Sequence, residues 1–196
     1  MSAETILSFL STCSMDQQLN FRIVTQCAPV LKGIKISNLI TIHSGMWNQV
    51  RKSLKGSSIN CFPLYMGKDK TVLFLYRPDQ LKRHLTRGEV IDFLQRYGYL
   101  DISLSGVLIR MKQRYQKYID QRTAFPHELG VMLEYPTEDV EGFIENQGKN
   151  CLLEKYWKVY HNKEQAEKIF QLYDQAKKEA MEEVVAGYPL YKVAVS

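Results

Sequence analysis

Two short runs of strand-forming residues, 59–65 and 71–76, lie on either side of a turn-forming Gly-Lys-Asp sequence at 67–69. Because glycine and aspartate favour tight turns, this pattern predicts an antiparallel β-hairpin. A third run, over residues 34–42, is rich in isoleucine and predicts a strand that ends at His43. One face of such a sheet has to be covered by other elements before a core can form.

Helical periodicity dominates the rest of the chain. Apolar residues recur at three- and four-residue spacing over residues 47–54 and 78–119, which predicts one short helix and then three packed helices. A longer stripe begins after Asn162, where Gln165 completes a pattern similar to a capping box, and ends at Gly187. Its apolar positions are Ala166, Ile169, Phe170, Tyr173, Ala176, Ala180, Met181 and Val184.

The N-terminal segment predicts a short helix over residues 3–10. Residues 21–24 either extend that helix or form a brief strand, and Pro29 is expected to break the chain after them.

Shorter elements are expected after residue 120. Pro126 and Pro136 punctuate two short helices, with Thr137 as the N-cap of the second. Alternation over residues 156–160 predicts a half-buried strand, and residues 190–195 predict a last strand.

These patterns predict a single α+β domain over residues 1–196, in which helices cover a small, mainly antiparallel sheet and the C-terminal helix is long and amphipathic. A hydrophobic content of 45% is normal for one globular core. We expect a cytoplasmic protein without a membrane span, because no apolar run is long enough and the N-terminus lacks a basic signal region.

The cysteines support a reducing compartment. Cys13, Cys27, Cys61 and Cys151 are widely spread and form no CxxC pair, so free buried thiols are expected. Disulfides would require an oxidising compartment.

Charge is distributed unevenly along the chain. Residues 1–120 hold 17 Lys/Arg against 8 Asp/Glu, whereas residues 121–196 hold 9 against 13. Such a dipole favours docking of an acidic partner on the N-terminal part, although an ordinary solvated surface explains it as well. We do not expect a nucleic-acid partner, because no helix-turn-helix, RRM or KH signature is present.

Strong chemical motifs are absent from the sequence. It contains no P-loop, GxGxxG, GxSxG, HExxH or EF-hand loop, so no cofactor is assigned. The four histidines have no metal-ligand spacing, so no metal site is expected.

Cys27 is the candidate nucleophile of an enzyme. The sequence Cys27-Ala28-Pro29 is compatible with a thiol at a helix N-terminus, where the dipole and nearby lysines favour the thiolate. His127 is then the candidate base. Two alternatives stand beside this hypothesis: a small cysteine that packs in the core, and a histidine that bonds to the backbone.

Other polar and aromatic residues suggest a ligand site. The basic group around Arg77 is suited to phosphate or to a solvated helix face, and Trp157 is suited to stacking on a flat ligand or to packing on a helix. The candidate ligand-binding residues are Lys32, Lys35, Arg77, Trp157 and Lys158, with His127 beside them.

Several ordered blocks resemble the bacterial family of unknown function DUF3793, which occurs in anaerobic Firmicutes. They are Cys27 to Lys35 with Asn38-Leu39, Tyr76-Arg77-Pro78, Phe125 to Gly130, Tyr135 to Phe143, and Tyr156 to Tyr160. The resemblance spans about residues 20–175 and implies a cytosolic protein whose gene lies near those of iron uptake and flavodoxins. Family members often carry cysteines in the last helix, where this chain has Asp174 and Ala176.

From these observations we predict a cytosolic protein with a cleft for a small anionic or flat ligand, linked to iron or redox metabolism. One alternative is an enzyme that uses Cys27 and His127. Another is a regulatory protein whose basic N-terminal part docks an acidic partner such as a flavodoxin.

Overall fold

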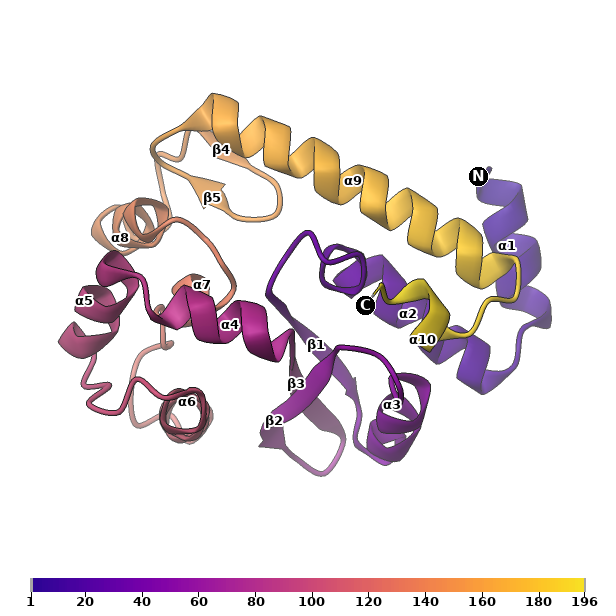
Figure 1. Cartoon of the computed structure of the whole chain (residues 1–196), viewed down its shortest axis with the longest axis horizontal. Helices are drawn as coiled ribbons and strands as arrows, with labels where there is room; N and C mark the ends of the chain where they lie inside the picture. Colours follow the sequence, from indigo (N-terminus) through magenta and orange to yellow (C-terminus); the bar gives the residue numbers. More distant parts are fainter. Residues whose placement is uncertain (1, 196) are drawn as a thin grey trace.

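A three-stranded antiparallel sheet lies between two layers of helices in the structure, a computed structural model that describes residues 2–195 (Figure 1). The strands are β1 (Ser37–His43), β2 (Asn60–Met66), β3 (Lys70–Tyr76), β4 (Leu153–Glu154) and β5 (Lys158–Val159). The helices up to the centre of the chain are α1 (Ala3–Thr12), α2 (Met15–Leu31), the 3-10 turn η1 (Ser44–Met46), α3 (Trp47–Ser53), α4 (Pro78–Leu85) and α5 (Gly88–Arg96). The later helices are α6 (Leu104–Ile119), α7 (Leu129–Met132), α8 (Thr137–Glu145), α9 (Lys163–Val185) and α10 (Leu190–Val193). The predicted α+β class is confirmed.

The central strand of the sheet is β3, which pairs antiparallel with β1 on one side and β2 on the other. The predicted hairpin and the strand that ends at His43 are therefore confirmed. Side chains of β3 alternate between the two faces: Leu73 and Leu75 pack against α2, α9 and α10, whereas Phe74 and Tyr76 pack against α4, α5 and α6. Because both faces of β3 are covered, its residues form an almost continuous apolar run.

The second helix corrects one prediction. Residues 21–24 lie inside α2, which begins with a capping box between Ser14 and Gln17. Pro29 lies inside this helix and not at its end, and the chain leaves the helix at Gly33, whose φ is +72°. The last turn of α2 is buried, and tertiary packing therefore outweighs the local cost of proline.

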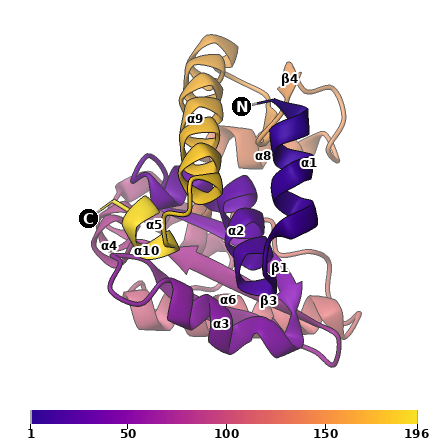
Figure 2. The same ribbon diagram turned by 90° about the vertical axis from the view of Figure 1, so that its right-hand side faces the viewer.

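The long C-terminal helix is confirmed. The Asn162 side chain accepts a hydrogen bond from the Gln165 amide at 3.1 Å, which begins α9 as predicted. The apolar stripe of α9 packs along α2, and α9 runs along the top of Figure 1 with α1 beside its C-terminal end, as Figure 2 also shows.

Three smaller predictions differ from the structure in detail. The predicted strand at 190–195 is wrong, because Leu190 and Val193 pack into the core one turn apart in the short helix α10. Pro136 and not Thr137 is the N-cap of α8. The predicted strand at 156–160 is reduced to β5, which pairs with β4 in a separate small hairpin.

The three packed helices predicted over residues 78–119 are confirmed as α4, α5 and α6. A third, smaller core forms where the β4–β5 hairpin packs on α9, and it contains Trp157, Val159, Phe170 and Tyr173. Within residues 2–195, none of the helices combines the length and the hydropathy that a membrane span requires.

Candidate functional site

A cavity of about 380 Å³ opens between the segment that contains α7 and α8 and the β4–β5 hairpin. Five aromatic rings dominate its wall, and they belong to Phe125, Tyr135, Phe143, Tyr156 and Trp157. Three of the residues nominated from the sequence also line it, namely His127, Trp157 and Lys158. The structure therefore brings together part of the predicted site.

Trp157 forms the inner wall of the cavity. Its ring stacks on Tyr135 at 5.3 Å between centroids and meets Phe170 of α9 edge-on at 4.5 Å. The indole Nε1–H donates a hydrogen bond of 2.8 Å to Asp139 Oδ2, so the ring is fixed in orientation. Tyr135 and Trp157 also line a second cavity, of about 450 Å³, on the side of α9.

Asp139 holds the β4–β5 hairpin against α8. This carboxylate lies in the first turn of α8 and is only 3% exposed, and its Oδ1 accepts hydrogen bonds from the amides of Tyr160 at 2.7 Å and His161 at 3.0 Å. Gly142 allows the two elements to approach closely, since a Cβ there would lie 2.6 Å from the Cβ of Tyr160. Nothing in the local sequence revealed the buried partners of Asp139.

The imidazole of His127 is a free polar group in the cavity. It lies 5.5 Å from the Phe125 ring and 5.3 Å from the Phe143 ring. Across the part of the chain that the structure describes, its ring nitrogens have no hydrogen-bond partner. Partial burial lowers the pKa of His127, although the nearby Glu128 opposes the shift. A neutral imidazole offers a ligand one donor and one acceptor.

Glu128 anchors the segment that carries His127. Its side chain is fully buried and forms an ion pair with Arg114 of α6, and it accepts a hydrogen bond from the Tyr99 hydroxyl at 3.2 Å. The carboxylate therefore does not orient the His127 ring, as expected for neighbours in sequence.

The lysines of the cavity have partners within the protein. Lys158 Nζ donates a hydrogen bond of 2.8 Å to the Gly148 carbonyl and lies 3.4 Å from Glu154. Lys155 Nζ pairs with Asp174 at 2.5 Å. The positive charge at this wall is partly neutralised, so the cavity offers more aromatic surface than free charge.

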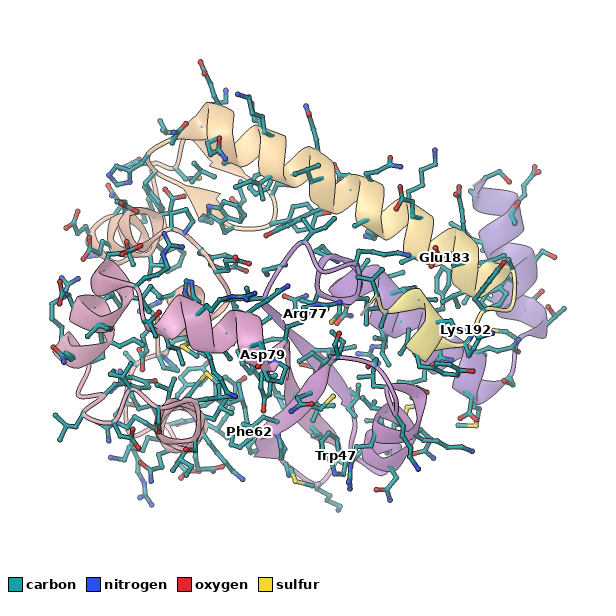
Figure 3. All side chains as sticks on the ribbon, in the orientation of Figure 1. Trp47, Phe62, Arg77, Asp79, Glu183 and Lys192 are labelled. Atoms are coloured by element: carbon teal, nitrogen blue, oxygen red, sulfur yellow. The ribbon has the colours of Figure 1, made fainter. Side chains whose placement is uncertain are left out.

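Arg77 lies outside the cavity, at the C-terminal end of α2 (Figure 3). Its guanidinium donates hydrogen bonds to the carbonyls of Val30 at 2.7 Å, Leu31 at 2.8 Å and Val195 at 2.8 Å, and to the Ser58 hydroxyl at 2.8 Å. These bonds satisfy the last carbonyls of α2 and attach the C-terminal segment to the sheet.

Lys32 lies nearby and also has a partner, because its Nζ forms a 2.6 Å ion pair with Glu183 of α9. The bridge joins the end of α2 to the end of α9.

Cys27 and Lys35 lie together in the core, connected by Asn38. The Asn38 Oδ1 accepts a hydrogen bond from Lys35 Nζ at 3.2 Å. The Nδ2 of the same side chain lies 3.7 Å from Cys27 Sγ and donates toward it. The Lys35 ammonium also lies 5.0 Å from the Tyr135 ring centroid. Burial raises the pKa of Cys27 to about 12 and lowers the pKa of Lys35 to about 8.

The prediction that Cys27 lies at a helix N-terminus is wrong, because the residue lies in the second half of α2. The thiol is fully buried in the core that surrounds α2, whereas His127 lines the cavity beside α8. A neutral, inaccessible thiol is a poor nucleophile. Within residues 2–195, no group of three or more His, Cys, Asp or Glu side chains is arranged to hold a metal ion.

The sequence pattern of the family described as "Protein of unknown function (DUF3793)" matches residues 23–194, and the resemblance seen in the ordered blocks is confirmed. No curated protein and no solved structure matches the chain.

Proposed function

The chain belongs to the DUF3793 family, and from this premise we propose that it is a cytoplasmic binding protein for a small, flat ligand that carries an anionic substituent. His127, Trp157 and Lys158 are the contacting residues in this proposal. Lys32, Lys35 and Arg77 take no direct part, because their side chains are engaged elsewhere in the fold.

The observation that carries the proposal is the free imidazole of His127 inside an aromatic cavity. The imidazole is half-buried, and with no partner in the protein its ring nitrogens are open to a ligand that enters the cavity. A ligand with one acceptor or donor at its edge supplies the missing partner. The rings of Phe125 and Phe143 near His127 offer apolar surface on which a flat ligand can pack.

The size of the cavity fits a ligand of a few fused rings. Its volume of about 380 Å³ lies in the lower part of the range found for small-molecule sites. Trp157 contributes a rigid apolar wall because Asp139 fixes its orientation. Lys155 and Lys158 lie at the wall and provide the attraction for an anionic substituent, reduced by Glu154 and Asp174.

A fluorescence titration with anilinonaphthalene sulfonate, a flat aromatic anion, tests the proposal. The chain has two tryptophans, so Trp47→Phe leaves Trp157 as the single reporter of the cavity. We expect the dye to quench Trp157 with saturation at one site. His127→Phe keeps the ring packing but removes the polar atoms, and we expect it to weaken binding about tenfold.

One control variant and two contrary outcomes decide the result. Lys168→Ala, on the exposed part of α9 and outside the cavity, should leave the affinity unchanged. If the parent protein and His127→Phe bound the dye with equal affinity, the imidazole would not be part of the binding site. Absence of any quenching of Trp157 would exclude the cavity as a site for flat anions.

The alternative of an enzyme based on Cys27 and His127 stays a prediction without a supporting contact. The same holds for the link to iron or redox metabolism that the family resemblance implies.

A further inference from the structure

Six exposed lysines lie on neighbouring elements of the fold. This lysine face consists of Lys52, Lys55, Lys68, Lys70, Lys112 and Lys117. They come from α3 and the residues after it, from the β2–β3 turn, and from α6. These elements lie together along the lower edge of Figures 1 and 2, whereas α9 lies along the upper edge.

Contacts between the elements show that they adjoin one another. The Ser44 hydroxyl, just before α3, donates a hydrogen bond of 2.7 Å to the Gly67 carbonyl in the β2–β3 turn. Lys112 of α6 lies 5.9 Å from the ring centroid of Phe62 in β2. Figure 3 shows Phe62 and Trp47 on the same lower side of the molecule.

The lysine face has almost no acidic counterpart. Asp69 is the one acidic residue between Trp47 and Tyr76, and α6 has none. Within the described residues 2–195, none of the six lysines forms an ion pair. In contrast, lysines around α9 and the β4–β5 hairpin are paired with carboxylates, for example Lys32 with Glu183 and Lys155 with Asp174.

Arg51, which is exposed on α3 beside Lys52, adds to the positive charge of these elements. A face that the fold does not neutralise is complementary to a negatively charged partner.

We propose that the lysine face is a docking surface for an acidic protein. Two large apolar side chains lie among the lysines: Met66 is 57% exposed beside Lys68, and Ile109 is 54% exposed one turn before Lys112. Apolar anchors surrounded by charge are typical of protein–protein interfaces.

The docking surface is independent of the ligand site. None of the six lysines lines the cavity that contains His127 and Trp157. A failed dye titration would therefore leave this proposal intact, and a failed docking experiment would leave the ligand site intact.

Fluorescence anisotropy with a labelled oligoglutamate peptide tests the surface on the full chain. We expect binding at about 0.05 M salt that weakens by at least tenfold at about 0.3 M, because the attraction is between solvent-exposed charges. The triple variant Lys52→Gln, Lys68→Gln, Lys112→Gln removes three charges from three elements of the face, and we expect about a tenfold loss of affinity.

The matched control removes three charges elsewhere. Lys149→Gln, Lys168→Gln, Lys178→Gln changes exposed lysines outside the face and alters the net charge equally. An equal loss of affinity in both triple variants would attribute binding to net charge and overturn the proposal. Tighter binding of a duplex RNA of equal charge, lost in the same face variant, would assign the surface to nucleic acid instead. Absence of peptide binding at low salt would exclude the surface altogether.

Discussion

The C-terminal end of α2 and the cavity beside the β4–β5 hairpin both contain polar side chains in apolar surroundings. At the end of α2, Arg77 has four hydrogen-bond partners, and three of them are backbone carbonyls. In the cavity, the His127 ring has none among the residues that the structure describes. The first region uses its polar atoms to hold the fold together, whereas the second leaves an imidazole free for a ligand. Both residues were nominated for the same predicted site, so residue type alone does not separate the two roles.

Replacement of Arg77 should have the largest effect. Arg77→Ala leaves the carbonyls of Val30, Leu31 and Val195 without their donor, and we expect a loss of about 3–5 kcal/mol in the free energy of unfolding. For a chain of this length that corresponds to a fall in Tm of about 10 °C. Urea denaturation measures the loss. Arg83→Ala, an exposed arginine on α4, is the control and should change stability by less than about 0.5 kcal/mol. Similar values for the two variants would contradict the structural role of Arg77.

Asp139 should have the second largest effect, because it links the cavity to the fold. Asp139→Ala removes the acceptor of the Trp157 indole and of two backbone amides, and we expect a loss of about 2–4 kcal/mol. The emission of Trp157 should also shift to longer wavelength in the Trp47→Phe background. Glu138→Ala, in the same helical turn but exposed, is the matched control. An unshifted spectrum in Asp139→Ala would show that the carboxylate does not position the ring.

Lys35 should give a smaller, pH-dependent effect. Burial lowers its pKa from 10.5 to about 8, so between these values the folded protein is neutral at Lys35 while the unfolded chain keeps the proton. Unfolding then takes up a proton, and stability rises with pH in this window. Lys35→Met lacks the buried charge and should be about 1–3 kcal/mol more stable than the parent at pH 7.

That advantage should shrink as the pH rises toward 9. Burial also raises the pKa of Cys27 and of Cys61 to about 12, so these thiols lower the stability as the pH rises above 9. Because Cys27 interacts electrostatically with Lys35, the difference between the two urea denaturation curves is compared only up to pH 9. A gap that is constant from pH 7 to 9 would show that the amine keeps an ordinary pKa.

His127 should have the smallest effect on stability. His127→Ala removes two ring contacts but no hydrogen bond, so we expect a loss of about 1 kcal/mol or less. The same substitution should weaken binding of the dye by at least about tenfold. If His127→Ala lowered the free energy of unfolding as much as Arg77→Ala does, His127 would have a structural role like that of Arg77, and the contrast between the two regions would be wrong.

Three of the seven residues nominated from the sequence line the cavity. His127, Trp157 and Lys158 meet in the cavity, whereas Cys27, Lys35 and Arg77 are buried in or against the core. Tyr135, Asp139 and Phe143 line the same cavity but were not nominated. Aromatic residues are common in cores, so their type and spacing carried no signal that distinguished a wall of the cavity from ordinary packing.

Short-range patterns in the sequence determined the β2–β3 hairpin, strand β1, helices α4 to α6 and the long helix α9, because turn residues, caps and apolar periodicity act within a few positions. Only the tertiary structure decided the role of the polar residues. Arg77 bonds to Val30, 47 positions before it, and to Val195, 118 positions after it. Its partners there are backbone carbonyls, which every residue has and which therefore leave no mark in the sequence. The burial of Cys27 and the lack of a hydrogen-bond partner for His127 among the described residues also depend on how distant segments pack together, so the sequence did not reveal them.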